Sequence, residues 1–574
     1  MNIPTTLNDL WQQIYGDRHT DVLSDFFQFL EQFKSEYTPE PQQPEWYKDA
    51  IVYSLYVDLF NHDFVGLTEK LDYLGNLGIN CIWLLPVLDS PMRDAGFDIR
   101  NYNKIRDELT GLPAGTGEEE KQAVFRKFLG HAHQRNIRVI FDIAMNHTSE
   151  EHPWFVEARK GEDNPYRNYY IWSRNTTLYK EARIIFKGME TSNWEQDGDW
   201  YYFHRFFNFQ PDLNYRNPIV LTEMCRNLLF WMRQGVDGFR VDAIPYLWKE
   251  EGTTCENLPK THLIVKFFRA VADYVRPHTL LLAEACQQPA EVVKYFGSGD
   301  ECHAGYHFPL MPQIFKAIAL ESYEPVRKTL SNEITPDIPD NAQWFTFLRC
   351  HDELSLERVY VSEDDRAFIH RHYCHRPEWD FRQGEGISAR LSELMGRNPQ
   401  KIALAFSVLL TLPGTPIIYY GDEFGKFNDE AYYQSRIKET GKDDTRFLVR
   451  GYIDWQQLNT DLKNNDSYAA RVFRQVKDMI WQRKRYNAFG RGIIFWMEPT
   501  NADGTPNHSV MAFIRKYSNE RLLIVQNLSS ETQSARLQFL PETAWIDLFG
   551  RQAHYDEISQ TIHLDPFEYL WLKV

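Results

Sequence analysis

The chain has 574 residues, of which 43% are hydrophobic and 25% charged, a balance typical of a globular protein and unlike that of a disordered or fibrous chain. Its formal net charge of −17 argues against a nucleic-acid partner and against a basic membrane anchor, because both need a positive surface. Seven cysteines without a C-x-x-C pair, and the lack of an apolar run long enough to span a bilayer, predict a cytoplasmic protein.

The first segment, residues 1–45, is predicted to be a helical extension. Apolar residues recur there at helical spacing, as in Leu7, Leu10 and Ile14. Three prolines in residues 38–44 predict a linker that ends this extension.

From residue 46 onward, short apolar runs alternate with amphipathic segments. Continuous apolar runs are typical of strands buried on both faces, and eight strand–helix units close into a (β/α)8 barrel. We therefore predict an α/β fold with a TIM barrel formed by residues 46–147 and 217–489. The eight runs are 51–57, 81–85, 139–141, 238–241, 280–283, 306–310, 344–348 and 416–420, of which the sixth has the weakest pattern.

Two further regions flank this pattern. Residues 148–216 form a long connection after the third strand, rich in aromatic residues, and are predicted to be an inserted subdomain over the barrel mouth, with strands at 182–186 and 200–203. Residues 490–574 alternate in hydrophobicity and are predicted to form a C-terminal antiparallel β-sandwich. Its expected strands are 492–496, 510–515, 522–526, 535–539 and 569–572.

Acidic side chains occur at the carboxyl ends of the predicted strands, where a barrel of this type carries its active site. Asp242 follows the fourth run, Glu284 the fifth, and Asp352 the seventh. Arg240 precedes Asp242 by two residues, so strand alternation points both side chains into the barrel. We therefore expect three carboxylates to converge on one pocket.

Two of these carboxylates suit the chemistry of a retaining glycosidase, which needs a nucleophile and an acid/base about 5–5.5 Å apart. Asp242 suits the nucleophile, because the adjacent cation of Arg240 is expected to keep its pKa low. Glu284 suits the acid/base, because a carboxyl group close to other acids can hold a proton near neutral pH. Asp352 is expected to bind sugar hydroxyls.

Six segments together resemble the α-amylase superfamily, glycoside hydrolase family 13. They are DIAMNH (142–147), QPDLN (210–214), GFRVDA (238–243), LLAEA (281–285), CHDE (350–353) and GTPIIYYGDE (414–423). The resemblance implies that Asp242 is the nucleophile, Glu284 the general acid/base and Asp352 the transition-state stabiliser.

The same resemblance implies which residues hold the innermost glucose. These are Arg240, His147 and His351, together with Phe97 and Asp98 of a segment that usually reads Gly-Tyr-Asp. Phe97 would stack on the sugar but lacks the tyrosine hydroxyl. Cys350 stands where an asparagine usually precedes the His-Asp pair.

Within this family the chain resembles trehalose synthases, through segments such as TSEEHPWF (148–155), GFRVDAIPYL (238–247) and FLRCHDELSLE (347–357). This implies a retaining α-glucosyl enzyme that interconverts maltose and trehalose with side hydrolysis. One alternative is a sucrose-using enzyme similar to amylosucrase or a sucrose hydrolase. Others are an α-glucosidase or α-amylase that hydrolyses maltooligosaccharides, and a barrel that has lost catalysis.

Residues 58–66 and 426–455, the N-terminal helices and Trp248-Lys249 resemble amylosucrase. This resemblance implies that Arg446 pairs with Asp94 at the pocket floor and enforces cleavage of a single glucose. No cofactor is required. A structural calcium ion near Asn146 and Asp212 is implied as an option, although the ammonium of Lys249 could take the cation's place. The expected partner is a small carbohydrate (maltose, trehalose or sucrose), with no nucleic acid and no membrane. The oligomeric state stays open, a homodimer being one option.

Overall fold

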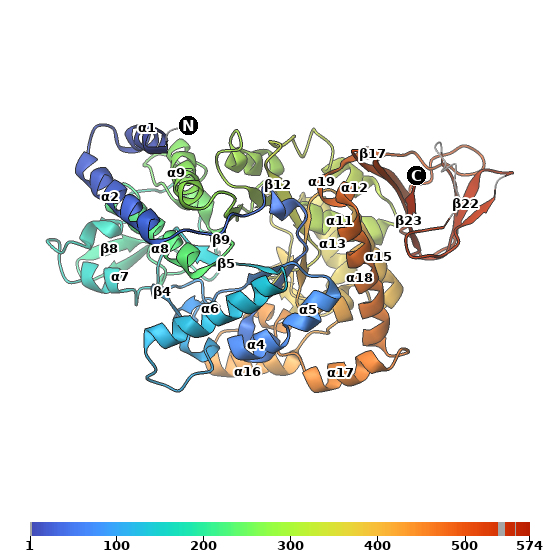
Figure 1. The fold of residues 1–574 in the computed structure, drawn as a ribbon, viewed down its shortest axis with the longest axis horizontal. Coiled ribbons are helices and arrows are strands. Elements are labelled where there is room, and N and C mark those ends of the chain that lie inside the picture. Colours follow the sequence, from blue (N-terminus) through green and yellow to red (C-terminus); the bar gives the residue numbers. More distant parts are fainter. Residues whose placement is uncertain (1–2, 187, 538–545, 557) are drawn as a thin grey trace.

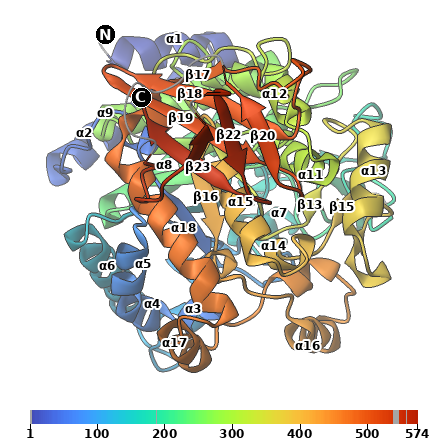
Figure 2. The same ribbon diagram turned by 90° about the vertical axis from the view of Figure 1, so that its right-hand side faces the viewer.

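The computed structural model describes residues 3–186, 188–537, 546–556 and 558–574. Eight parallel strands close into a barrel in the order β1-β16-β12-β11-β10-β9-β5-β2, so the predicted TIM barrel is confirmed (Figures 1 and 2). The strands are β1 (Val52–Leu55), β2 (Cys81–Leu84), β5 (Arg138–Ala144), β9 (Gly238–Asp242), β10 (Leu280–Ala283), β11 (Ala304–Tyr306), β12 (Gln343–Phe347) and β16 (Thr415–Tyr419).

The sixth strand is displaced from its predicted position. The sequence pattern placed it at 306–310, whereas β11 ends at Tyr306 and Leu310 already begins helix α11. Pro309 lacks the N–H that a central strand must donate, and it stands at the N-cap of that helix. The apolar side chains after Tyr306 therefore belong to a helix start.

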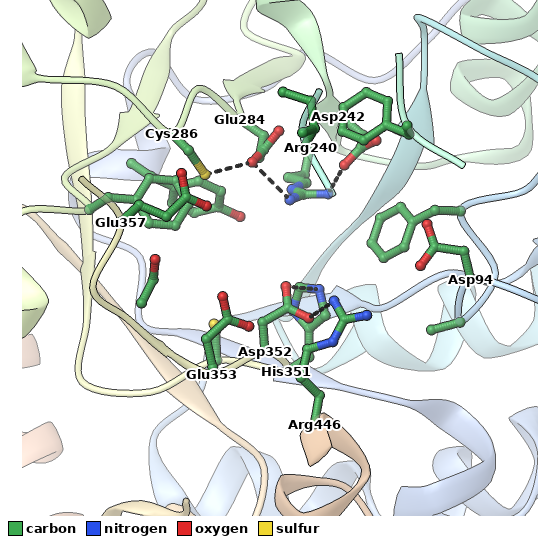
Figure 3. Close-up of a pocket in the computed structure, with 18 of the residues that line it drawn as sticks. Asp94, Arg240, Asp242, Glu284, Cys286, His351, Asp352, Glu353, Glu357 and Arg446 are labelled. Atoms are coloured by element: carbon green, nitrogen blue, oxygen red, sulfur yellow. Dashed lines mark hydrogen bonds and ion pairs between the residues drawn. The ribbon is translucent and has the colours of Figure 1, made fainter. Parts of the chain in front are cut away.

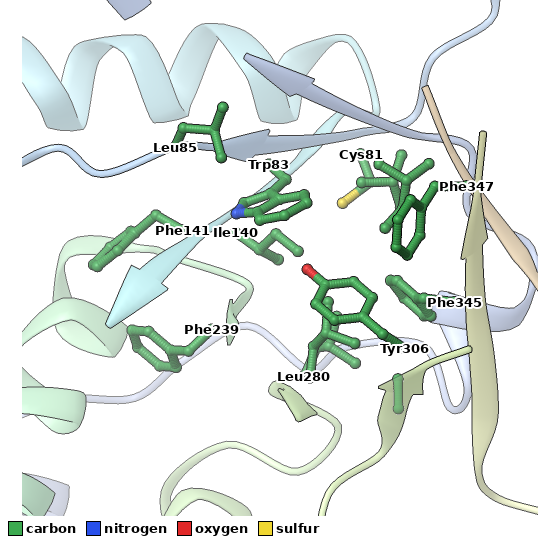
Figure 4. Packing of buried hydrophobic residues seen from close by; sticks show 14 of the residues in the cluster. Cys81, Trp83, Leu85, Ile140, Phe141, Phe239, Leu280, Tyr306, Phe345 and Phe347 are labelled. Carbon is green, nitrogen blue, oxygen red and sulfur yellow. The ribbon is translucent and has the colours of Figure 1, made fainter. Parts of the chain in front are cut away.

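The barrel interior is filled by large apolar side chains from neighbouring strands (Figure 4). Trp83, Tyr306 and Phe347 are all less than 5% exposed. Close strand packing explains Gly238 at the start of β9, because a Cβ at this position would lie 2.5 Å from Cβ of Leu280. Burial of this apolar surface holds the strand ends in place.

Helices lie between the barrel strands along the chain and follow the last of them, β16 (Figure 2). They are α3 (Val57–Asn61), α4 (Phe64–Glu69), α5 (Leu71–Leu77), α6 (Glu118–Gln134), α8 (Pro218–Gln234), α9 (Pro259–Val275), α10 (Pro289–Val292), α11 (Leu310–Leu320), α12 (Glu324–Thr329), α13 (Glu363–Tyr373), α14 (Leu391–Leu394), α15 (Pro399–Thr411), α16 (Glu430–Thr440), α17 (Trp455–Lys463), α18 (Tyr468–Arg485) and α19 (Asn487–Arg491). Short hairpin strands lie in the loops at β3 (Leu88–Asp89), β4 (Asn101–Ile105), β13 (Leu354–Ser355), β14 (Asp380–Phe381) and β15 (Gly386–Ile387).

The predicted N-terminal helices are present as α1 (Ile3–Tyr15) and α2 (Thr20–Glu36), which lie beside α8 and α9 in Figure 1. The rings of Trp11 and Phe267 lie 6.0 Å apart, and the hydroxyl of Tyr15 donates a 2.8 Å hydrogen bond to the carbonyl of Tyr215. The apolar stripe read from the sequence is therefore the face that packs on the barrel.

The long connection after β5 contains helix α7 (Pro153–Ala158) and an antiparallel sheet of β6 (Trp172–Ser173), β8 (Trp200–Phe203) and β7 (Trp194–Asp197). The predicted strand at 200–203 is confirmed. The strand predicted at 182–186 is wrong, because this segment is a loop in which the carbonyl of Ala182 accepts a hydrogen bond from the Asn193 side chain. The loop instead directs side chains toward the barrel mouth.

The C-terminal region contains two antiparallel sheets, with strand orders β17-β18-β19-β23 and β20-β22-β21. Apolar residues from both sheets, among them Val525 and Ile562, share one buried cluster, which confirms the predicted sandwich. The prediction missed β21 and β22, and its strand 535–539 extends beyond the described residues. The strands are β17 (Ile493–Trp496), β18 (Val510–Tyr517), β19 (Glu520–Asn527), β20 (Gln533–Arg536), β21 (His554–Asp556), β22 (Thr561–Leu564) and β23 (Tyr569–Lys573). Among the described helices, none is both long and apolar enough to cross a lipid bilayer.

Candidate active site

Three carboxyl groups from separate strands line one pocket at the rim of the barrel (Figure 3). Asp242 is the last residue of β9, Glu284 directly follows β10, and Asp352 lies in the loop after β12. β9 and β10 are paired in parallel, with Val241 opposite Ala283, so their carboxyl ends meet at the same rim. The structure therefore brings together the three acids that the sequence singled out.

Arg240 is the cation at the centre of this arrangement. Its Nη1 lies 3.0 Å from Oδ1 of Asp142 and 2.6 Å from Oδ1 of Asp242, and its Nη2 lies 3.8 Å from Oε1 of Glu284. Three acids thus share one positive charge. Burial raises the pKa of Asp142 to about 7, against the opposing effect of Arg240.

The pKa of Asp242 departs from the sequence-based expectation. Burial raises this pKa well above its ordinary value, and the charges of Glu284 and Asp142 add to the increase, while Arg240 opposes it. The expected low pKa is therefore wrong, because one guanidinium shared among three buried acids does not outweigh their desolvation.

Asp352 has the opposite electrostatic environment. Its Oδ1 lies 3.2 Å from Nη1 of Arg446 and 3.3 Å from Nη2 of Arg450, and its Oδ2 lies 3.1 Å from Nε2 of His351. Burial opposes ionisation, but these three neighbours together hold the pKa of Asp352 well below its usual range. Asp352 therefore stays ionised at neutral pH.

The predicted pair between Arg446 and Asp94 is not formed. The guanidinium of Arg446 instead binds Asp444, with Nη2 2.7 Å from Oδ2, in addition to Asp352. The carboxylate of Asp94 accepts a 2.9 Å hydrogen bond from the side chain of Gln210. Both Asp94 and Arg446 line the pocket. The ion pair between Arg446 and Asp444, two residues before it in the chain, was not predicted from the sequence pattern.

The two predicted histidines also lie in the pocket and are neutral. Burial lowers the pKa of His147 to about 4 and that of His351 to about 3. The backbone of Phe97 forms a hydrogen bond with His147, whose ring lies 5.1 Å from that of Phe206 between centroids. A neutral imidazole has one donor and one acceptor nitrogen, so His147 is suited to hydrogen bonding with a sugar hydroxyl.

Phe97 lines the pocket as expected, whereas Asp98 does not. The ring of Phe97 is stacked on that of His351, with centroids 5.8 Å apart. Asp98 is fully buried, and its carboxylate accepts hydrogen bonds from the Ser90 hydroxyl and from the backbone N–H groups of Arg93 and Asp94. In this structure the side chain of Asp98 therefore holds the loop that carries Phe97, and its contact with substrate stays a prediction.

A further wall of the pocket was not predicted from the sequence. It is lined by Arg183, Ile185, Phe186 and Phe206 of the insertion and by Tyr246, Cys286, Glu357 and Arg382 of the barrel loops. The aromatic run 201–209 (YYFHRFFNF) was a usable signal for Phe206. Cζ of Arg382 lies 4.6 Å from the centroid of the Phe186 ring, and Nε of Arg183 lies 2.9 Å from Oε1 of Glu256. These contacts join segments that are distant in the chain, so no local sequence pattern predicts them.

The residues implied for a calcium site do not fit the ion. Nζ of Lys249 lies 2.8 Å from Oδ2 of Asp212 and 2.7 Å from Oδ1 of Asn146, and its side chain is 2% exposed. A cation bound by these oxygens would be placed against an ammonium group. The geometry fits the alternative in which Lys249 supplies the positive charge.

A (β/α)8 barrel with an acid-lined, aromatic-walled pocket at its carboxyl rim defines a carbohydrate-active enzyme. Residues 13–371 match the family model for the alpha amylase catalytic domain, and residues 505–571 match that for the maltogenic amylase C-terminal domain. The chain therefore belongs to the α-amylase family, glycoside hydrolase family 13.

Individual relatives cover most of the chain. It is 39% identical to trehalose synthase/amylase TreS of Mycobacterium tuberculosis, over 91% of this chain and 89% of that protein. It is 43% identical to an oligo-1,6-glucosidase of Heyndrickxia coagulans, over 91% of this chain and 98% of that protein. An α-amylase from H. orenii superposes with a TM-score of 0.69 over 92% of this chain and 99% of that chain; at 24% identity this likeness shows the fold alone.

Proposed function

We propose that this protein is a retaining α-glucosyl enzyme that interconverts maltose and trehalose and hydrolyses a fraction of its substrate. The observation that carries the proposal is that Asp242 and Glu284 bind the same guanidinium, that of Arg240, inside one pocket. Their carboxyl groups thus face one space, as a double displacement at a single sugar carbon requires. The similarity to trehalose synthases supports the choice of sugar.

In the first step, Asp242 attacks the anomeric carbon of the terminal glucose and forms an ester with it. The bond from that carbon to the glycosidic oxygen breaks, and Glu284 donates a proton to the departing oxygen. Asp352, kept ionised by His351, Arg446 and Arg450, stabilises the positive charge that develops on the sugar ring. Asp242 reacts as the carboxylate, and the guanidinium of Arg240 at its Oδ1 stabilises the charge that this form carries.

In the second step, the released glucose turns within the pocket and presents its anomeric hydroxyl. Glu284 removes the proton of this hydroxyl as its oxygen attacks the esterified carbon, and Asp242 is released as a carboxylate. Water in the same position gives hydrolysis instead. The aromatic side chains of Phe186, Phe206 and Tyr246 line the pocket and support retention of glucose, because apolar rings beside the sugar leave less room for water.

The test is incubation with maltose, trehalose and sucrose, followed by chromatography of the products. Trehalose formed from maltose supports the proposal, and free 13C-glucose added to the reaction is expected to enter trehalose only slowly if the released glucose stays bound. Asp242→Asn should lower turnover by orders of magnitude, because it removes the covalent step. Fructose from sucrose, without trehalose from maltose, would replace this proposal by a sucrose-using enzyme.

A hydrolytic α-glucosidase is the second candidate, favoured by the 43% identity to an oligo-1,6-glucosidase. It predicts glucose as the only product of maltose and cleavage of isomaltose. We also propose a cytoplasmic location, supported by seven cysteines that are all free thiols in the structure.

A further inference from the structure

Both carboxylate oxygens of Glu284 have hydrogen-bond donors. Oε2 accepts a 3.1 Å hydrogen bond from the backbone N–H of Ala243. Oε1 accepts a 3.1 Å hydrogen bond from the thiol of Cys286 (Figure 3). Oε1 is also the oxygen that lies 3.8 Å from Arg240. The two oxygens are therefore held by groups of different chemistry.

Cys286 reaches Glu284 because the two residues are separated by one position after β10. Both side chains line the pocket, whereas Ala285 between them is fully buried. Burial raises the pKa of the Cys286 thiol well above its ordinary value, and the charge of Glu284 raises it further. The sulfur therefore keeps its proton at neutral pH and can donate it in a hydrogen bond.

The two donors support different states of the carboxyl group. A backbone N–H can only donate, so Ala243 favours an unprotonated Oε2. A thiol is a weak donor and a weak acceptor, so Cys286 can donate to an ionised Oε1 and accept from a protonated one. Oε1 can therefore keep its hydrogen bond with Cys286 in both the protonated and the ionised state of Glu284.

We propose that Cys286 is a positioning residue that holds Oε1 of Glu284 in both protonation states, so that this oxygen delivers the proton to the leaving group. The inference rests on the proposed function, in which Glu284 is the acid/base. A sulfur hydrogen bond is weak, and its expected role is orientation of the carboxyl group rather than a large change in its acidity. Losing that orientation slows the step in which a poor leaving group must be protonated.

The experiment compares two substrates in Cys286→Ala, Cys286→Ser and the unmodified enzyme. Maltose has a sugar leaving group that needs a proton, whereas α-glucosyl fluoride has a leaving group that departs with little acid assistance. We expect kcat/KM of Cys286→Ala to fall roughly 10-fold for maltose and less than about twofold for the fluoride, since positioned acids contribute about 10²–10⁴-fold in all. Cys286→Ser, whose hydroxyl can also donate and accept, should recover most of the maltose activity.

The pH profile gives a second readout. The alkaline limb of kcat/KM for maltose should move only slightly in Cys286→Ala, because a weak sulfur hydrogen bond changes the acidity of Glu284 little, while the height of the profile falls. Both should stay in place in Cys374→Ala, which removes a thiol whose bond goes to the Arg376 carbonyl. If Cys286→Ala fails to fold, Cys286→Val, which replaces the thiol by a somewhat larger side chain without a polar atom, carries the same measurements.

Two outcomes would overturn the inference: equal losses for both substrates, which indicate a purely structural role, or no loss for maltose. Failure of the proposed function has a different signature. In that case Glu284→Gln would keep near-normal activity on maltose, whatever the cysteine variants do.

Discussion

Replacing Lys249 by Met should strongly destabilise the fold. The ammonium is 2% exposed, and it lies 2.8 Å from a carboxylate oxygen of Asp212, which is itself 0% exposed. Methionine keeps the side-chain length but leaves the charge of Asp212 buried without a cation, together with an unpaired Oδ1 of Asn146. Breaking a buried pair from one side costs about 3–5 kcal/mol, so we expect a loss of that size in the free energy of unfolding.

The assay is denaturant unfolding followed by tryptophan fluorescence, with two matched variants. Lys104→Met removes a lysine whose ammonium lies 3.4 Å from Glu118 at the surface and is 43% exposed, and should cost less than about 1 kcal/mol. The double variant Lys249→Met/Asp212→Asn removes both buried charges and should recover part of the loss. A Lys249→Met protein as stable as the unmodified one would refute the reasoning.

Calcium adds an independent check of the same site. Because the ammonium fills the place of a cation, removal of divalent ions by a chelator should leave the unmodified protein unchanged. Lys249→Ala opens that place beside the oxygens of Asp212 and Asn146, and millimolar calcium is expected to raise its unfolding midpoint. Stabilisation of the unmodified protein by calcium would contradict the proposed role of Lys249.

Three further predictions concern the pocket and the pH dependence of stability. Asp352→Asn should lower kcat for maltose by about 10²–10³-fold, because it removes a charge that stabilises the transition state. Phe186→Ala should raise the ratio of glucose to trehalose among the products of maltose, because it opens the pocket wall to water. Burial raises the pKa of Glu423 to about 7 from an ordinary value of 4.5, so the folded protein holds a proton that the unfolded chain releases. The free energy of unfolding should therefore fall as the pH rises through this window, and Glu423→Gln should flatten the fall.

The outcomes that contradict these predictions are distinct. A normal kcat in Asp352→Asn would remove this residue from the chemistry, and an unchanged product ratio in Phe186→Ala would show that the wall does not control water. For Glu423, whose carboxylate accepts 2.7 Å hydrogen bonds from the hydroxyls of Tyr53 and Tyr73, an equally steep pH dependence in the glutamine variant would assign the proton to other groups.

The sequence alone was sufficient for the barrel and for the position of its three acids. Strands buried on both faces appear as uninterrupted apolar runs, and polar residues at their carboxyl ends must meet at one rim once the strands are parallel. Asp242, Glu284 and Asp352 follow from this rule without any knowledge of loop shape. The sixth strand was misplaced because only three of its residues are paired and a helix begins four residues later.

The residues that surround these three acids could be identified only from the tertiary structure. Local patterns do not encode the distances between loops. These distances decide that Arg446 binds Asp444 and not Asp94. They also decide that the carboxylate of Asp98 accepts hydrogen bonds from its own loop. The pKa of Asp242 depends in the same way on how many buried acids share Arg240. The periodicity of apolar residues indicates which side of a strand is buried. The ion pairs and hydrogen bonds at the barrel rim, in contrast, join side chains that are far apart in the chain, and only folding brings these side chains into contact.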